Sequence, residues 1–217
     1  GHDATVGGAV VDSGKFDWME HKEKFPGLCT PDESYHGIVY AQKFGNAGAY
    51  ITKATVQLMR DLGSVQAPVN AYMLNLGLES LAVRMERHCS NALAVAEFLE
   101  QNENVAWVNY PGLADNQYYR RAQKYMNGGT CGVVSFGVKG GRPAAEKFMK
   151  NLHLAMIATH VADARTCVLH PASSTHRQMT DEELAAGGVP ADLVRLSVGI
   201  ENVSDIIADL KQALSSL

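Results

Sequence analysis

One arginine of this sequence occupies a position from which it could bind an anion. In the strand expected over residues 193–198, side chains alternate between two faces, so Val194 and Leu196 share one face and Arg195 and Ser197 the other. Because the apolar face must pack on the core, Arg195 is directed to the opposite surface. A planar guanidinium on a rigid strand can bind a carboxylate at two points. The alternative is a surface arginine paired with a nearby acidic side chain, and spacing alone favours this alternative.

Histidines around a hydroxyl-rich loop are the second group that could do chemistry. His170 and His176 flank this loop, but no third ligand of suitable spacing accompanies them, so we expect no metal site. His160 and Asp163 precede an expected strand, as many site residues do, and alone they define no chemistry. No dinucleotide-binding, phosphate-loop or serine-nucleophile motif is present. The residues by themselves therefore predict a carboxylate-binding domain.

The composition excludes several classes of protein. The 217 residues carry a formal net charge of -4, with 46% hydrophobic and 19% charged residues, which is typical of a globular protein. Lys and Arg are scattered, so we expect neither nucleic acid nor a membrane as a partner, and the apolar runs are too short to span a bilayer. The four cysteines are far apart and form no CxxC pair, which favours a reducing cytoplasm.

Strand and helix patterns alternate through the last part of the chain. Thr180 and Glu183 have the spacing of a capping box for a short helix, and Asn202 is placed to cap a final one. Strands separated by helices of this size predict a layered α/β domain. The expected strands cover residues 105–110, 131–138, 165–169 and 193–198, and the expected helices cover residues 117–126 and 143–152.

A long helix is expected to connect this part to the preceding one. Pro68 can open it, and apolar residues three or four apart continue from Leu74 to Leu99, with Arg84 on the polar side. We place a domain boundary near its start.

The first part of the chain contains an expected buried strand at residues 6–11 and a helix at 50–62. The predicted domains are therefore 1–66 and 67–217. Because the chain starts directly with strand-like residues, we expect it to be a piece of a longer polypeptide.

Several long stretches carry a resemblance to a known family. In order along the chain they are GLESLAVRMERHCSNALAVAEFL, VNYPGL, VSFGVKGG, HPASSTH and LVRLSVGIENVSDIIADL. The sequence resembles the Cys/Met-metabolism family of pyridoxal-phosphate enzymes over nearly all of its length. Two further stretches, FPGLCTPDESYHGIVYAQKFG and THVADARTCVLHPASSTHRQ, look most like the O-acetylhomoserine sulfhydrylase branch. The γ-lyases usually lack the first and carry Ser-Leu-Gly where this chain has His160–Val161–Ala162.

The resemblance implies roles for three residues. Arg195 would hold the α-carboxylate of the substrate, which reverses the preference drawn from spacing. Thr175 would support that arginine. The position of the family's carboxylate-contacting serine falls on His160, where the contact comes from the backbone or is lost.

The resemblance also implies a fold and a cofactor. The fold is fold-type I, like aspartate aminotransferase, with 1–66 as the end of the large domain that binds pyridoxal 5'-phosphate and 67–217 as the small domain. The lysine that forms the Schiff base would lie a few residues upstream of Gly1–His2. We therefore expect no cofactor-binding residue within this chain, which would need the N-terminal half of the same enzyme.

The implied activity is a γ-replacement that makes homocysteine, or methionine, from O-acetylhomoserine and sulfide, or a thiol. The alternatives are cystathionine γ-synthase, a methionine or cystathionine γ-lyase, and a non-catalytic fragment. The family assembles as dimers or tetramers, so we expect a homo-oligomer, a dimer of dimers.

Overall fold

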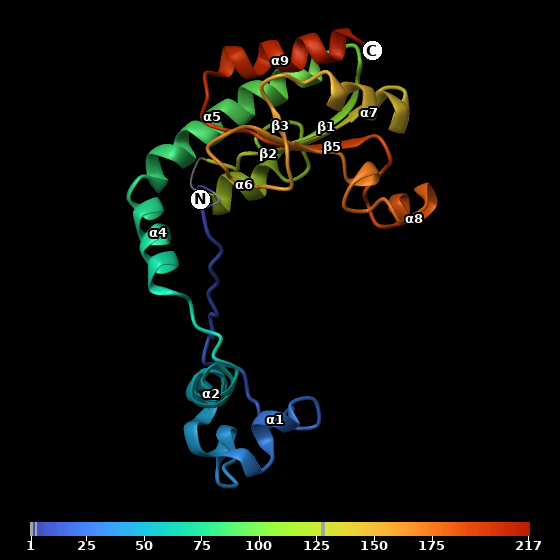
Figure 1. Ribbon diagram of the computed structural model, residues 1–217. Helices are drawn as coiled ribbons and strands as arrows, with labels where there is room; N and C mark the ends of the chain where they lie inside the picture. Colours follow the sequence, from blue (N-terminus) through green and yellow to red (C-terminus); the bar gives the residue numbers. More distant parts are fainter. Residues whose placement is uncertain (1, 3, 127–128) are drawn as a thin grey trace. The chain divides into compact units, whose positions relative to one another are not determined.

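The computed structural model describes residues 2, 4–126 and 129–217, which form two compact units. One unit covers residues 6–72, and the other covers residues 73–217 together with the described residues of the first five. Figure 1 shows the helices and strands of both units. Among the described residues, no helix combines the length and the apolar character that crossing a membrane requires.

The unit of residues 6–72 is helical. The expected helix at 50–62 is confirmed, but helical structure starts earlier, and its middle part has π-helical turns. Gly63 ends it with a φ of 66°, a conformation that glycine adopts without strain. The elements are α1 (Pro26–Cys29), η1 (Glu33–Tyr35), α2 (Tyr40–Lys53), η2 (Ala54–Met59) and α3 (Arg60–Leu62).

The strand expected at residues 6–11 is wrong for this structure. The segment is extended, but it pairs with no strand among the described residues, and the side chains of Val6 and Val11 are 89% and 92% exposed. An apolar run becomes a buried strand only when neighbouring strands and a covering layer are available. All five described strands belong to the other unit.

The second unit is built on a five-stranded sheet with the order β1-β2-β5-β4-β3. Only β3 and β4 pair in parallel, and the other neighbours are antiparallel. The four expected strands are confirmed, and β3, with two residues, is too short to leave a sequence pattern. The strands are β1 (Val105–Asn109), β2 (Val133–Val138), β3 (Met156–Ile157), β4 (Cys167–Leu169) and β5 (Leu193–Ser197).

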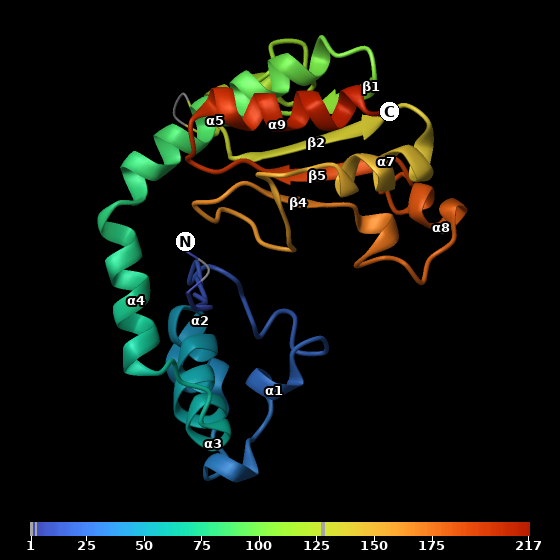
Figure 2. The same ribbon diagram turned by 45° about the horizontal axis from the view of Figure 1, so that its top comes forward.

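Three helices cover one face of this sheet: α5 (Leu81–Glu100), α7 (Gly141–Lys150) and α9 (Val203–Ser215). Figure 2 shows them on the same side of β2 and β5. The apolar residues of the strands pack against them, and Phe136 contacts Phe148 edge to face at 5.7 Å between ring centres. The remaining elements of this unit are α6 (Tyr119–Tyr125), η3 (Pro171–Ser173) and α8 (Asp181–Ala186).

The expected helix ends are confirmed at two places. Thr180 and Glu183 form the complete capping box of α8, with hydrogen bonds in both directions. Asn202 caps α9 by accepting the backbone N–H of Ser204 at 3.0 Å. Both caps fix where the chain leaves a loop, so they set the length of the loops around the sheet.

The single long helix expected from residue 68 is divided in two. α4 (Pro68–Glu79) ends before Ser80, whose φ of -105° and ψ of 7° are not helical, and α5 follows. Arg84, expected on the polar side, is instead 6% exposed and donates to the carbonyl of Gly77 at 2.6 Å. The arginine thus satisfies a backbone acceptor that the break leaves without its helical partner.

Candidate functional site

Strand β5 positions Arg195 by simple alternation. Val194 and Leu196 are fully buried against the helices, as predicted, while Arg195 and Ser197 project from the opposite face. In the ladder, Arg195 pairs with Ser135 of β2 on one side and with β4 on the other. The guanidinium therefore starts from the middle of a rigid sheet.

The connection from β3 to β4, residues 158–166, passes over this face. Arg195 Nη2 donates to the carbonyl of Thr159 at 2.8 Å, and the backbone N–H of Ala162 donates to Ser197 Oγ at 2.9 Å. The two polar side chains of β5 thus hold the connection at two points. We call residues 158–166 the covering loop.

The positive charge of Arg195 is not neutralised within the described part of the chain. No carboxylate of residues 2, 4–126 or 129–217 is within ion-pair distance of it, and Nε is buried without a hydrogen-bond partner there. Enclosed guanidinium groups are usually paired, because desolvating a charge without a partner is unfavourable. The arrangement therefore fits an external anion.

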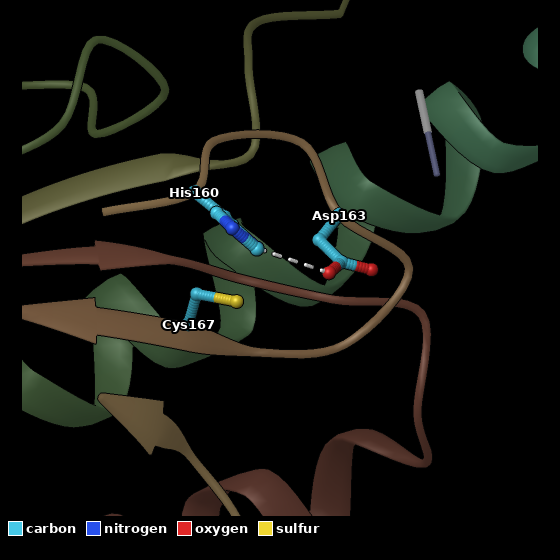
Figure 3. A group of neighbouring side chains, drawn as sticks. All are labelled: His160, Asp163 and Cys167. Carbon is cyan, nitrogen blue, oxygen red and sulfur yellow. Dashed lines mark ion pairs between the residues drawn. The ribbon is translucent and has the colours of Figure 1, made fainter. Parts of the chain in front are cut away.

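His160 belongs to the covering loop, and its side chain faces Asp163. Its Nδ1 lies 3.5 Å from Asp163 Oδ2, and Figure 3 shows the ring facing that carboxylate. Arg165 donates to the same oxygen at 3.0 Å. The His160 side chain is 40% exposed, whereas Asp163 is nearly buried. The backbone of His160 follows directly after Thr159, whose carbonyl accepts the hydrogen bond from Arg195.

Thr175 does not contact Arg195 in this structure. It is exposed, and its Oγ1 lies 2.9 Å from Nδ1 of the adjacent His176. Its loop does begin close to the arginine, because Leu169 at the end of β4 pairs directly with Arg195. The structure therefore brings Arg195 and the covering loop together, and it leaves Thr175 apart.

His170 has a structural role. It is 1% exposed, its Nδ1 lies 2.8 Å from Ser173 Oγ, and its Nε2 donates to the carbonyl of Ala191 at 2.8 Å. Since both ring nitrogens are occupied, His170 and His176 are not a metal pair. The hydroxyl-rich loop is instead fixed around the buried ring.

A second set of hydrogen bonds holds the far end of the covering loop, and the sequence analysis missed it. The Glu201 carboxylate accepts the backbone N–H of Thr166 at 2.6 Å and its hydroxyl at 2.9 Å, and Thr166 Oγ1 accepts the N–H of Gly199 at 2.9 Å. A Cβ at Gly199 would lie 2.5 Å from the carbonyl oxygen of Ala164 and 2.5 Å from Thr166 N. Only glycine fits this position.

Helix α5 fixes the same turn from the other side. His88 Nδ1 donates to the carbonyl of Val198 at 2.7 Å, and Asn91 Nδ2 donates to those of Gly199 and Glu201 at 3.0 and 2.9 Å. These contacts join residues more than 100 positions apart, so no local pattern could reveal them. The sequence Gly199–Ile200–Glu201 at the strand exit has no motif that predicts these contacts.

The α/β unit thus presents Arg195 from a central strand beneath the covering loop, and no acidic partner for it is found among the described residues. A family model described as Cys/Met metabolism PLP-dependent enzyme matches residues 1–215. The chain belongs to this family, whose members depend on pyridoxal 5'-phosphate (PLP).

The chain is similar to curated relatives that are named homocysteine synthase or O-acetyl-L-homoserine sulfhydrylase. The chain is 46% identical over 214 residues to a homocysteine synthase of Schizosaccharomyces pombe, covering 99% of this chain and 50% of the relative. It is 45% identical to O-acetyl-L-homoserine sulfhydrylase 1 of Thermus thermophilus, again over 99% of this chain and 50% of the relative. The chain thus spans about half the length of the curated relatives it matches.

A solved structure agrees in fold. It is assigned as an O-acetylhomoserine (thiol)-lyase of Campylobacter jejuni and contains a pyridoxyl-lysine phosphate group. Its TM-score is 0.80 at 37% identity, over 92% of this chain and 47% of that one. The fold class is therefore confirmed as the C-terminal portion of a fold-type I α/β enzyme.

The expectation that this chain holds no cofactor-binding residue stays a prediction, and the contacts of Lys53 agree with it. PLP requires an amine that can bond to its aldehyde and donors for its phosphate. Lys53, the most enclosed amine of its unit, already donates to Asp32 at 2.8 Å and to the carbonyl of Gly27 at 2.7 Å. We therefore assign no cofactor contact to the described residues.

Proposed function

We propose that this chain is the C-terminal part of a PLP-dependent O-acetyl-L-homoserine sulfhydrylase. The enzyme makes homocysteine from O-acetylhomoserine and sulfide, or methionine when a thiol takes the place of sulfide, by γ-replacement. The proposal is supported by relatives of 45 and 46% identity that carry this activity in their names. The structural observation that carries it is the arginine of β5, held in place without an acidic partner.

In this proposal Arg195 binds the α-carboxylate of the amino-acid substrate. The hydrogen bond from Nη2 to Thr159 fixes the plane of the guanidinium, and Nε keeps its donor for another acceptor. The cofactor, when bound, supplies the electron sink for the reaction. A carboxylate held at two points fixes the orientation of the substrate's Cα–H bond, which makes proton removal efficient.

Thr175 and His160 have secondary roles in the same site. The loop of Thr175 begins beside Arg195, so the threonine can support the guanidinium when the loop closes on a substrate. Since the His160 ring faces Asp163, the backbone of His160 is the part that contributes to the carboxylate site. Both assignments depend on the primary role of Arg195.

The remaining parts of the enzyme follow from the same proposal. Residues 1–66 complete the large cofactor domain, and residues 67–217 form the small domain. The N-terminal half of the same enzyme supplies the cofactor lysine, and the complete protein is a homo-oligomer, a dimer of dimers, in the cytoplasm.

The test uses the complete enzyme and the variant Arg195→Ala. We expect kcat/KM for O-acetylhomoserine to fall about 100-fold through KM, because two charge-assisted hydrogen bonds worth together about 3 kcal/mol are lost. The colour of the bound cofactor should remain. Arg87→Ala, at an exposed position of α5, is the control and should leave both kinetic constants unchanged.

The reaction type is tested on the unaltered enzyme. Homocysteine formation from O-acetylhomoserine and sulfide should exceed the breakdown of methionine or cystathionine. Faster elimination from methionine would assign the protein to the γ-lyases instead. A variant Arg195→Ala that loses the cofactor colour would contradict the carboxylate role.

A further inference from the structure

We propose that His160, Asp163 and Cys167 form a binding site for one zinc ion. One ligand atom from each residue lies within 4.8 Å of the others, and Figure 3 shows the three side chains converging. Zinc bonds of about 2.0–2.3 Å in a tetrahedron separate neighbouring ligand atoms by roughly 3.3–3.8 Å. His160 Nδ1 and Asp163 Oδ2 are already 3.5 Å apart. Small side-chain rotations are enough to complete the set with the thiolate.

The combination of ligands selects the metal. An imidazole nitrogen, a carboxylate oxygen and a thiolate together suit zinc better than the hard cations magnesium or calcium, which take oxygen ligands. The three residues also lie within eight positions of the chain, so one short segment supplies them all. Water would take the fourth position, because the His160 side chain is 40% exposed and leaves an open side.

The surroundings hold two of the ligands in place before any ion binds. Cys167 begins β4 and pairs with Met156 on one side and Ser197 on the other, so its thiol projects from the same face as Ser197. Asp163 Oδ1 accepts the backbone N–H of Arg165 at 3.2 Å, which turns Oδ2 toward His160. A pre-oriented carboxylate loses less entropy when it binds a metal.

Arg165 competes with the ion. Its Nη2 lies 3.0 Å from Asp163 Oδ2, so the guanidinium occupies one side of the oxygen that zinc would bind. The Arg165 side chain is 62% exposed, however, and can rotate into solvent with little loss of energy. Zinc binding therefore requires this rotation, which gives the proposal a distinctive consequence: removal of the guanidinium should strengthen binding.

The sequence analysis expected no metal because it considered His170 and His176. His160 and Asp163 were noted there without a third ligand, and Cys167 was hidden in the pattern of a strand. Only the path of the covering loop over the sheet brings the thiol to the other two. The proposal does not depend on the enzymatic activity, because the site lies entirely within this chain.

Equilibrium dialysis of the untagged chain against zinc tests the proposal. We expect one ion per chain, with affinity about tenfold to 100-fold weaker in His160→Ala and in Cys167→Ser. Arg165→Gln should bind about tenfold more tightly, because a positive charge near the ion is removed. Cys89→Ser and His176→Ala are matched controls outside the cluster and should bind as the unaltered chain does.

Cobalt provides a second measurement, because its absorption spectrum reports directly on whether a thiolate is bound to the metal. Bound Co²⁺ should show a thiolate charge-transfer band, and Cys167→Ser should abolish it while His176→Ala retains it. His160→Ala changes a partly exposed residue, so it keeps the test valid if the cysteine variant fails to fold. Absence of stoichiometric zinc binding, or binding unaffected by both ligand variants, overturns the proposal.

Discussion

Asp209 shows how one carboxylate can hold a turn of the main chain. From α9 it accepts three successive backbone N–H groups, those of His153, Leu154 and Ala155, at 2.8–2.9 Å. Burial by itself raises the pKa of Asp209, but these hydrogen bonds and one from Gln212 together outweigh it, so the net pKa lies below the ordinary value. The carboxylate therefore stabilises the start of β3 only while it is ionised.

Asp209→Asn should lower the free energy of unfolding at neutral pH by about 1–3 kcal/mol, because an amide NH₂ would face a backbone donor. A lowered pKa in the folded state means that the contribution is present above the unfolded pKa of about 3.9 and is lost as the pH falls toward the lower folded value. Urea unfolding between pH 7 and pH 3 measures this. The difference between the two proteins should shrink only below about pH 4, and Asp205→Asn on the same helix should show no such trend.

Alternation along a strand was enough to predict the face of Arg195. The surroundings of Arg195 could not be predicted, because its contact with Thr159 and the contact of Ser197 with Ala162 both depend on the path of the covering loop. The same holds for Glu201, whose contact with Thr166 spans 35 positions of the chain. Residue periodicity predicts direction, whereas side-chain partners over such separations depend on tertiary structure.

At the level of elements, the covering loop contains a strained residue. Ala162 has a φ of 62°, in the left-handed region that disfavours residues with a Cβ. Its N–H donates to Ser197 Oγ, which fixes this conformation over the sheet. The loop geometry is thus maintained at some expense in backbone energy.

Ala162→Gly should raise the free energy of unfolding by up to about 1 kcal/mol, because glycine relieves the strain. The gain is limited because glycine also increases the conformational entropy of the unfolded chain. Ala158, in the same loop, does not have a positive φ. Ala158→Gly should therefore lower the free energy of unfolding by roughly 0.5–1 kcal/mol. Thermal unfolding of both variants measures the difference. Equal effects of the two substitutions would show that the Ala162 conformation is not maintained in solution.

Most elements of residues 105–217 were predicted, because they have a strong hydrophobic period or a cap, whereas the short β3 and η3 were not. The prediction of a strand at residues 6–11 was wrong, because a strand needs neighbouring strands to pair with. This segment pairs with none among the described residues. The helix was not predicted to break at Ser80, because the apolar spacing continues across this residue. Arg84, which donates to Gly77 and to Ser80, stabilises the break. Local patterns thus predicted the elements, and non-local contacts decided their interruptions.

On the scale of the whole molecule, α4 exposes much apolar surface. Tyr72, Leu76 and Leu78 are 64%, 52% and 61% exposed, and no residue of α4 is buried. Apolar surface of this extent on a helix commonly marks an interface. Under the proposed function, the remainder of the enzyme covers it.

The variant Leu76→Asp should change the stability of the isolated chain by less than about 0.5 kcal/mol, because the residue is exposed. It should, however, lower the yield of assembled enzyme when introduced into the complete protein, since a charge would be buried in the interface. Urea unfolding measures the stability of the isolated chain, and sedimentation velocity measures the assembly of the complete enzyme. Tyr125→Asp, at a 74% exposed site on α6, is the control, and equal assembly of the two variants would exclude α4 from the interface.

The hydrogen bonds between α5 and the residues that follow β5 have a mechanical consequence. His88 and Asn91 hold three carbonyls within four residues, directly after the strand that carries Arg195. These hydrogen bonds join α5 directly to the end of β5. A rotation of α5 would therefore move the strand and the guanidinium that it carries. Ser80, with its non-helical dihedrals, directly precedes the same helix and separates it from α4. A rotation of α4 can be taken up by the backbone at Ser80. A rotation of α5 itself would instead be transmitted through His88 and Asn91 to the strand of Arg195.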